Sequence, residues 1–91
     1  MIKEISSLQN PLVKHIVDLK SKAALRRKTD TCVVEGVKEL EIAYRSGLRV
    51  ESIWMERTSY ENDMVPWMDD IENIYICTAA VMDKISLRDN A

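Results

Sequence analysis

The sequence predicts an α/β domain with a mainly parallel sheet. Apolar residues recur with helical spacing in the first segment, and three short β-branched runs then alternate with helical patterns. Strands that are joined through helices need right-handed crossovers, which make the strands parallel and place the helices on the faces of the sheet. A chain of 91 residues, 46% apolar and 31% charged, has room for one core, so residues 1–91 are expected to form one domain.

The first helix is expected to begin after Asn10. Asparagine is a favoured N-cap, and Pro11 suits the first helical position because its missing N–H needs no partner there. The stripe expected to pack on the core consists of Leu12, Ile16, Leu19 and Ala23. The face expected to be solvated consists of Lys14, Asp18 and Lys22.

The first strand–helix unit is expected between residues 31 and 47. The run Thr-Cys-Val-Val at 31–34 is too short for a helix and sufficiently β-branched for a buried strand. Glu35 and Gly36 then form the turn into a helix, which is expected to end at the Ser-Gly pair at 46–47. The apolar stripe of this helix consists of Val37, Leu40, Ala43 and Tyr44.

Two further units complete the domain. "RVESIWM" at 49–55 and "NIYICT" at 73–78 predict strands, and the capping-box spacing at 58–61 predicts a short helix that contains Pro66 and Trp67. Thr78 is expected to cap the last helix. The apolar positions of that helix are Val81, Met82 and Ile85. The residues expected near the centre of the sheet are Val33, Ile53 and Ile76.

Positive charge is concentrated in residues 14–28. This stretch holds six Lys and Arg residues against one Asp, a balance of +5, whereas residues 29–91 hold six against thirteen acids, a balance of −7. The net charge of −2 therefore conceals a dipolar molecule with a positive pole at its first helix and the following loop. Two interpretations stay open: a surface for a polyanion, and a solvated helix end in which Arg26, Arg27 and Lys28 complement the helix dipole.

Two details favour the polyanion. Asn10 and Lys14 lie one turn apart on the same helix, and the Glu35-Gly36 turn follows closely after the basic run. The N–H groups at a helix start can hold a phosphate, and Gly36 lets another backbone approach closely. Glu35 has two compatible interpretations: an acid that favours the helix dipole or pairs with an arginine, and an acceptor for the amino group of a base.

Other functions lack the residues that they require. His15 is the only histidine and has no Cys or carboxylate at ligand spacing, and Trp54 and Trp67 are expected in the core or at an interface. With two glycines there is no Gly-rich phosphate loop, no GxGxxG and no Ser/His/Asp set. The sequence therefore assigns no catalytic, metal-binding or cofactor-binding residue.

The cysteines and the hydropathy pattern bear on location. Cys32 and Cys77 lie in apolar runs without metal-ligand spacing and follow no secretory signal, so a reducing compartment, the cytoplasm, is expected. No apolar segment approaches the roughly 20 residues needed to cross a bilayer, so a membrane partner is not expected.

Three motifs are spaced along the chain: "NPLVK" at 10–14, "RRK" at 26–28 and "CVVEGVKELEIAYRSG" at 32–47. Together they resemble the amino-terminal substrate-binding domain of the SpoU (TrmH-like) RNA 2′-O-ribose methyltransferases, in which Asn-Pro-x-(Val/Ile)-Lys precedes Arg-Arg or Arg-Lys and then Phe-x-x-Glu-Gly. The resemblance extends through "VMDKISLRDN" at 81–90. Cys32 stands where the family usually has Phe, a difference that bears on core packing.

The resemblance implies a fold similar to ribosomal protein L30e, a three-layer α/β/α sandwich. It also implies that the domain helps to recognise structured RNA, with ribosomal RNA ranked ahead of transfer RNA. The partner would be a C-terminal knotted domain of the same protein that binds S-adenosylmethionine and methylates a ribose, and the full-length protein is expected to be a homodimer. Because this chain carries none of the family's catalytic motifs, it is expected to be inactive alone and to bind no cofactor.

Six positions match the family pattern, and two neighbouring cations complete the expected RNA site. The matching positions are Asn10, Lys14, Arg26, Arg27, Glu35 and Gly36, and the added cations are Lys22 and Lys28. Two other functions stay open. The first is a stand-alone L30e-like structural RNA-binding protein, which a reading frame continuing past Ala91 into glycine-rich motifs would disfavour. The second is a protein-interaction or dimer-arm domain built on Trp54, Trp67 and the methionines, which a failure to bind RNA at low salt would favour.

Overall fold

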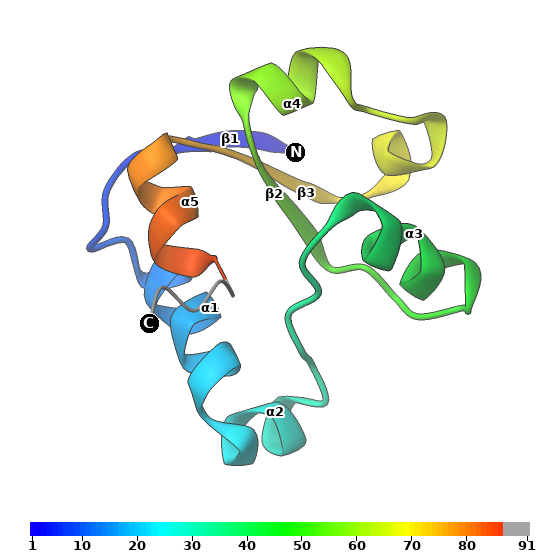
Figure 1. Cartoon of the computed structure of the whole chain (residues 1–91). Helices are drawn as coiled ribbons and strands as arrows, with labels where there is room; N and C mark the ends of the chain where they lie inside the picture. Colours follow the sequence, from blue (N-terminus) through cyan, green and yellow to red (C-terminus); the bar gives the residue numbers. More distant parts are fainter. Residues whose placement is uncertain (87–91) are drawn as a thin grey trace.

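The computed structural model of the protein describes residues 1–86 and contains one three-stranded sheet (Figure 1). Its strands are β1 (Ile2–Ile5), β2 (Ser52–Glu56) and β3 (Asn73–Cys77), in the order β1-β3-β2. Both neighbours pair with β3 in parallel, with Ile5 opposite Cys77 and Trp54 opposite Tyr75. The predicted α/β class and the parallel sheet are confirmed.

The first strand of the sheet is not the predicted one. Residues 31–34 form no strand, and β1 at the amino terminus pairs with the free edge of β3 instead. The Thr31 N–H donates to the Arg26 carbonyl rather than to a neighbouring strand, and Val34 is exposed. The run pairs with neither outer strand of the sheet, so a β-branched composition does not suffice for a strand, and β1 was missed because three of its four residues are exposed.

The first predicted helix is two helices. Asn10 caps α1 (Pro11–Ser21) as predicted, but the backbone is extended at Lys22 and the chain continues in a separate helix, α2 (Ala23–Thr29). Val13 is fully buried and Leu19 is 4% exposed, whereas Leu12 is 41% exposed. The predicted stripe was therefore wrong at Leu12 and at Ala23, which is exposed, because the core contacts α1 through the face that carries Val13 and the chain bends before Ala23.

The second predicted helix is confirmed. It is α3 (Val37–Arg45), and it lies between two glycines with left-handed backbone, Gly36 at φ +103° and Gly47 at φ +89°. Positive φ at these positions suits glycine, which has no Cβ to clash with the backbone. The Ser46 N–H donates to the Ile42 carbonyl, so the helix ends at the predicted Ser-Gly pair.

The segment between β2 and β3 also differs from the prediction. A six-residue helix, α4 (Arg57–Asn62), begins before Thr58, so Thr58 is not its N-cap. Pro66 and Trp67 belong to a separate 3₁₀ helix, η1 (Pro66–Asp70). Proline has no N–H for a preceding carbonyl and its ring clashes with that turn, so it starts a new helical turn rather than continuing α4.

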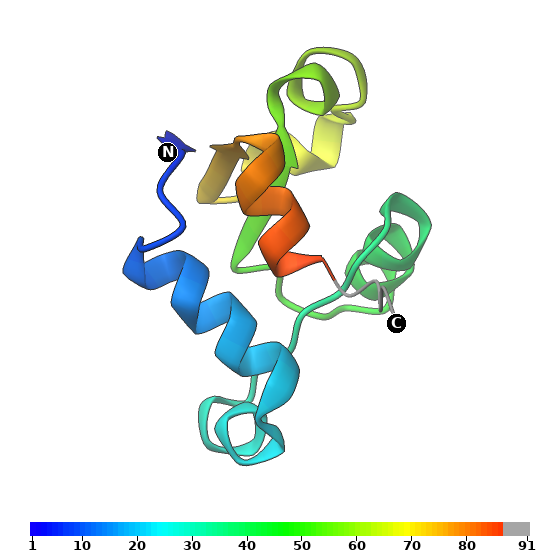
Figure 2. The ribbon, with the colours of Figure 1, turned by 60° about the vertical axis from the view of Figure 1, so that its left-hand side comes forward.

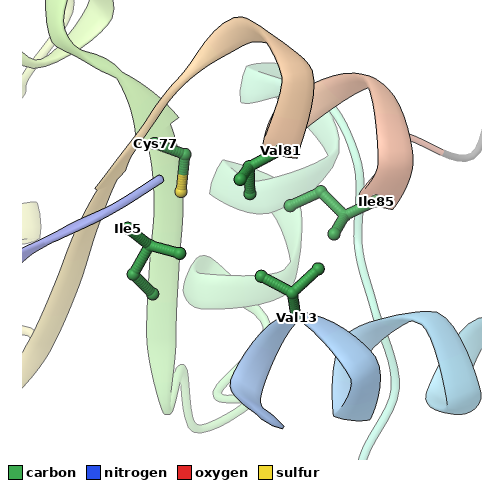
Figure 3. Packing of buried hydrophobic residues seen from close by; sticks show 5 residues of the cluster. All are labelled: Ile5, Val13, Cys77, Val81 and Ile85. Atoms are coloured by element: carbon green, nitrogen blue, oxygen red, sulfur yellow. The ribbon is translucent and has the colours of Figure 1, made fainter. Parts of the chain in front are cut away.

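The last helix, α5 (Ala79–Ile85), is capped as predicted, since the Val81 N–H donates to Thr78 Oγ1 at 3.3 Å. Helices α1 and α5 contact each other and lie side by side against one face of the sheet (Figure 2). Between them lies the principal hydrophobic cluster (Figure 3), and its members are Ile5, Val13, Cys77, Val81 and Ile85.

The opposite face of the sheet is also buried. Ile53 and Ile76 are 6% and 5% exposed, as predicted for the centre of the sheet, whereas Val33 lies outside the sheet. Alternation along the strands directs these isoleucines away from α5. Helix α4 contacts β2 and β3, and η1 contributes the buried Met68. The sheet is therefore covered on both faces.

Candidate nucleic-acid interface

The bend of the chain at Lys22 affects which of the predicted cations bond to α1 and which stay exposed. It turns α2 away from the end of α1, at the lower end of the molecule in Figure 1. From α2, the Arg26 guanidinium donates to the carbonyls of Leu19 at 2.6 Å and Lys20 at 2.9 Å. These are two of the last carbonyls of α1, which have no partner within the helix. Arg26 thus caps α1, and its side chain is partly buried between the two helices.

Three other cations of this region point to solvent. Lys22, Arg27 and Lys28 are exposed, and we call them the basic corner. Lys22 makes an exposed ion pair with Asp18 at 3.4 Å. Within residues 1–86, Arg27 and Lys28 form no ion pair and no side-chain hydrogen bond. Exposed ion pairs contribute little to stability, so all three charges can bind a phosphate at little cost to the fold.

The predicted residues at the start of α1 lie apart from the basic corner. Asn10 Oδ1 accepts from the Leu12 N–H at 2.8 Å, so its side chain caps the helix. Lys14 is exposed on the first turn. The 11 residues of α1 span about 16 Å, so Asn10 lies at the other end of the helix from Lys22. A ligand that touched Lys14 and the basic corner together would have to run along α1.

The Glu35-Gly36 turn lies beside the end of α5. Ser86 Oγ donates to Glu35 Oε1 at 2.9 Å, across 51 positions of sequence. The turn favours glycine at position 36 because φ is +103° there, where a Cβ would strain the backbone. A cavity of about 270 Å³ separates this segment from the helices, and it is lined by Leu19, Lys20, Arg26, Cys32 and Val33.

One cation at this end was not predicted as a site residue. Lys20 Nζ donates to the carbonyl of Ile85 at 2.9 Å and also to the carbonyl of Ser86. The Lys20 ammonium, which belongs to α1, thus caps the C-terminal end of α5. The contact joins residues 65 and 66 positions apart, and local sequence carries no signal for such a pair.

A larger cavity of about 430 Å³ lies at the carboxyl ends of the three strands. Its rim carries Glu4 and Glu56 against one cation, Arg57, which is paired with Glu4. Burial raises the pKa of the Cys77 thiol from 9.0 to about 11. A hydrogen bond from the Met55 backbone partly opposes this increase, and the nearby Glu56 charge adds to it. This cavity therefore offers a neutral thiol and excess negative charge, which disfavours a phosphate group.

The tryptophans, His15 and the cysteines lie in surroundings that indicate no binding or catalytic role within residues 1–86. Trp54 lies 4.7 Å from Tyr75 between ring centroids, and Trp67 stacks on Tyr44 at 4.0 Å and 13°. His15 is exposed, and residues 1–86 contain no group of three His, Cys, Asp or Glu side chains that could hold a metal ion. Cys32 is exposed and Cys77 buried, both as free thiols. Among the helices of the described part, none has the length and apolar character needed to cross a membrane.

A positive corner on a small α/β scaffold, with no metal cluster in the described residues, is typical of a domain that binds an anionic partner. The comparison with protein families specifies the class. The model of the MRM3-like substrate binding domain matches residues 10–91, and the chain belongs to this family. No curated protein and no solved structure matches the chain significantly.

The family match agrees with the resemblance to the substrate-binding domain of SpoU-type methyltransferases. It indicates an RNA methyltransferase recognition domain, and RNA is the partner that such a domain implies. The motifs at 10–14, 26–28 and 32–47 all lie inside the matched range. The end of the resemblance, residues 87–90, lies outside the described residues.

Proposed function

We propose that the chain is the RNA-recognition domain of an S-adenosylmethionine-dependent RNA 2′-O-ribose methyltransferase that acts on ribosomal RNA. Methyl transfer and cofactor binding belong to a separate C-terminal domain of the same protein, which works as a cytoplasmic homodimer. The family match and the three spaced motifs support this proposal. The observation that carries it is the basic corner, because three exposed cations gather on one end of a domain whose net charge is −2.

The eight predicted residues divide into three roles. Lys14, Lys22, Arg27 and Lys28 present exposed charges that neutralise phosphates, which supplies affinity independent of sequence. Asn10 and Arg26 cap the two ends of α1, so they hold the surface in shape rather than touch RNA. Glu35 and Gly36 form the turn beside α5, where the carboxylate can accept from a base amino group.

The described residues do not fit S-adenosylmethionine. Neither cavity is lined by a glycine, and the two glycines of the chain flank α3 on the surface. No step of methyl transfer is therefore assigned to this chain. Calorimetric titration of the chain with S-adenosylmethionine should show no heat of binding. A micromolar dissociation constant would contradict the assignment of cofactor binding to the C-terminal domain.

The test of RNA binding uses fluorescence anisotropy with labelled ribosomal RNA fragments that contain a hairpin and an internal loop. The Arg27→Gln/Lys28→Gln variant should weaken binding and flatten the slope of log affinity against log salt by about 1.4, at roughly 0.7 per single-stranded phosphate contact. The matched control, Lys3→Gln/Arg49→Gln, removes two exposed cations outside the basic corner and should leave the slope unchanged.

Three other outcomes would change the conclusion. If both double variants lowered the slope equally, binding would be a property of overall charge rather than of the basic corner. An unchanged slope for Arg27→Gln/Lys28→Gln would reduce these cations to a solvated helix end. No binding even at low salt would favour the interaction domain, for which α3 and its flanks supply apolar surface: Val37, Ile42 and Leu48 are 61%, 65% and 59% exposed.

A further inference from the structure

A side-chain hydrogen bond joins the Glu35-Gly36 turn to the residue after α5. Residues 31–36 pair with no strand, and no residue of this segment is buried. At its start, the segment is tied to α2 through the Thr31 N–H and the Arg26 carbonyl. At its end, Ser86 Oγ donates to Glu35 Oε1 at 2.9 Å. Where Ser86 is held therefore affects the place of the turn on the surface.

Ser86 is the residue just after α5, where a helix leaves its last carbonyls without partners. Lys20 fills this gap from the facing helix, since its Nζ donates to the Ile85 carbonyl at 2.9 Å and to the Ser86 carbonyl. Lys20 is partly buried, unlike the cations of the basic corner. On the same two helices, Val13 and Ile85 pack in the core cluster and fix the spacing between α1 and α5.

From these two contacts, Lys20 with Ser86 and Ser86 with Glu35, we infer that Lys20 is a positioning residue for RNA recognition. It supports the Glu35-Gly36 turn through Ser86 without touching RNA. The inference rests on the proposed function and adds to it a residue outside the predicted site. It gives different roles to two nearby cations: Lys20 holds the turn in place, and Lys22, two residues later, faces the RNA phosphates.

The central variant is Lys20→Met, which keeps the length of the side chain and removes the ammonium. RNA affinity should fall about ten- to a hundredfold, the range expected for loss of hydrogen bonds to a charged group, with an unchanged salt slope. Ser86→Ala should reproduce the loss, and combining Lys20→Met with Ser86→Ala should add little, because both changes release the same turn. Lys20→Arg, which retains a donor, should recover most of the affinity.

The control is Lys22→Met, whose ion pair is exposed. It should lower the salt slope by about 0.7, as one phosphate contact requires, and leave the turn unaffected. Amide hydrogen exchange without RNA provides an independent readout. Lys20→Met and Ser86→Ala should speed exchange at Gly36 and in the first turn of α3, whereas Lys22→Met should not.

The outcomes separate the two hypotheses. If the parent chain bound no RNA, the proposed function would fail and the positioning role with it. If the parent bound RNA and Lys20→Met bound equally well, only the positioning role would be overturned. A lowered salt slope for Lys20→Met would also overturn it, since Lys20 would then contact phosphate itself.

Discussion

Two regions of the molecule differ in how they are held. Every buried residue of the described chain lies in residues 1–19 or 53–86, which we call the core region, and none lies in residues 20–52, the outer region. The core region contains the sheet, α1 up to its last turn, α4 and α5. The outer region contains α2, the 31–36 segment and α3, and with them the basic corner and the Glu35-Gly36 turn.

Helices α5 and α3 differ in what holds them to the rest of the molecule. In α5, Val81 is fully buried and Ile85 is 7% exposed, so the hydrophobic effect fixes the helix. In α3 no residue is buried, and the helix is tied to the rest through the Tyr44–Trp67 stack. Stability and the proposed RNA site thus belong to different regions, so substitutions should separate them.

The largest effect is expected in the core region. Val13→Ala removes apolar atoms at a site with no exposed area and should lower the free energy of unfolding by about 2 kcal/mol. Its neighbour Leu12 is 41% exposed, so Leu12→Ala should cost less than about 0.5 kcal/mol. Urea unfolding measures both, and equal losses would contradict the burial pattern of α1.

A smaller effect is expected where the two regions join. Arg26→Gln deprives the carbonyls of Leu19 and Lys20 of a charged donor and should cost about 1–2 kcal/mol. Arg27→Gln, one residue later and exposed, should change the free energy of unfolding by less than about 0.5 kcal/mol. If Arg27→Gln were the more destabilising of the two, the capping role of Arg26 would be wrong.

The aromatic stack in the outer region should contribute less. Tyr44→Leu keeps an apolar side chain but removes the stacking, with an expected loss of about 0.5–1.5 kcal/mol. Trp67 fluorescence should report the change in its surroundings, and amide exchange in α3 should accelerate. Ile42→Ala, on an exposed position of the same helix, is the control and should leave Trp67 fluorescence unaltered.

At neutral pH the smallest effect is expected from the buried thiol, whose contribution to stability changes only at alkaline pH. Because burial raises the pKa of Cys77 from 9.0 to about 11, the folded state keeps the neutral thiol at a pH where the unfolded chain ionises it. The free energy of unfolding should therefore fall as pH rises from 9 towards 11. Thermal melts of Cys77→Ala should lack this part of the alkaline loss, whereas Cys32→Ala should retain it.

The sequence predicted elements whose signals are local. Asn10-Pro11 and Thr78 mark two helix starts, and both side chains accept backbone N–H groups as predicted. The Ser-Gly pair at 46–47 marks a helix end. Each signal depends on atoms within three residues of one another, so it persists whatever the rest of the chain does.

Predictions that depended on distant partners fared differently. The run at 31–34 has the composition of a strand but pairs with none, whereas Ile2–Ile5, with isoleucine only at its two ends, pairs with β3. Leu12 and Val13 are adjacent and both apolar, and the way α1 faces α5 buries the second. Composition ranks such candidates, but the partner surface selects between them.

By itself, the sequence determined the parallel α/β class, the helix caps at Asn10 and Thr78 and the separation of charge, because all three follow from local spacing and composition. Only the tertiary structure decided which cations remain exposed and available to the proposed RNA site. Arg26 turns back onto the end of α1 and Lys20 reaches the end of α5, while Lys22, Arg27 and Lys28 stay exposed. The physical reason is that helix-end carbonyls require donors, and their nearest donor is set by how helices pack.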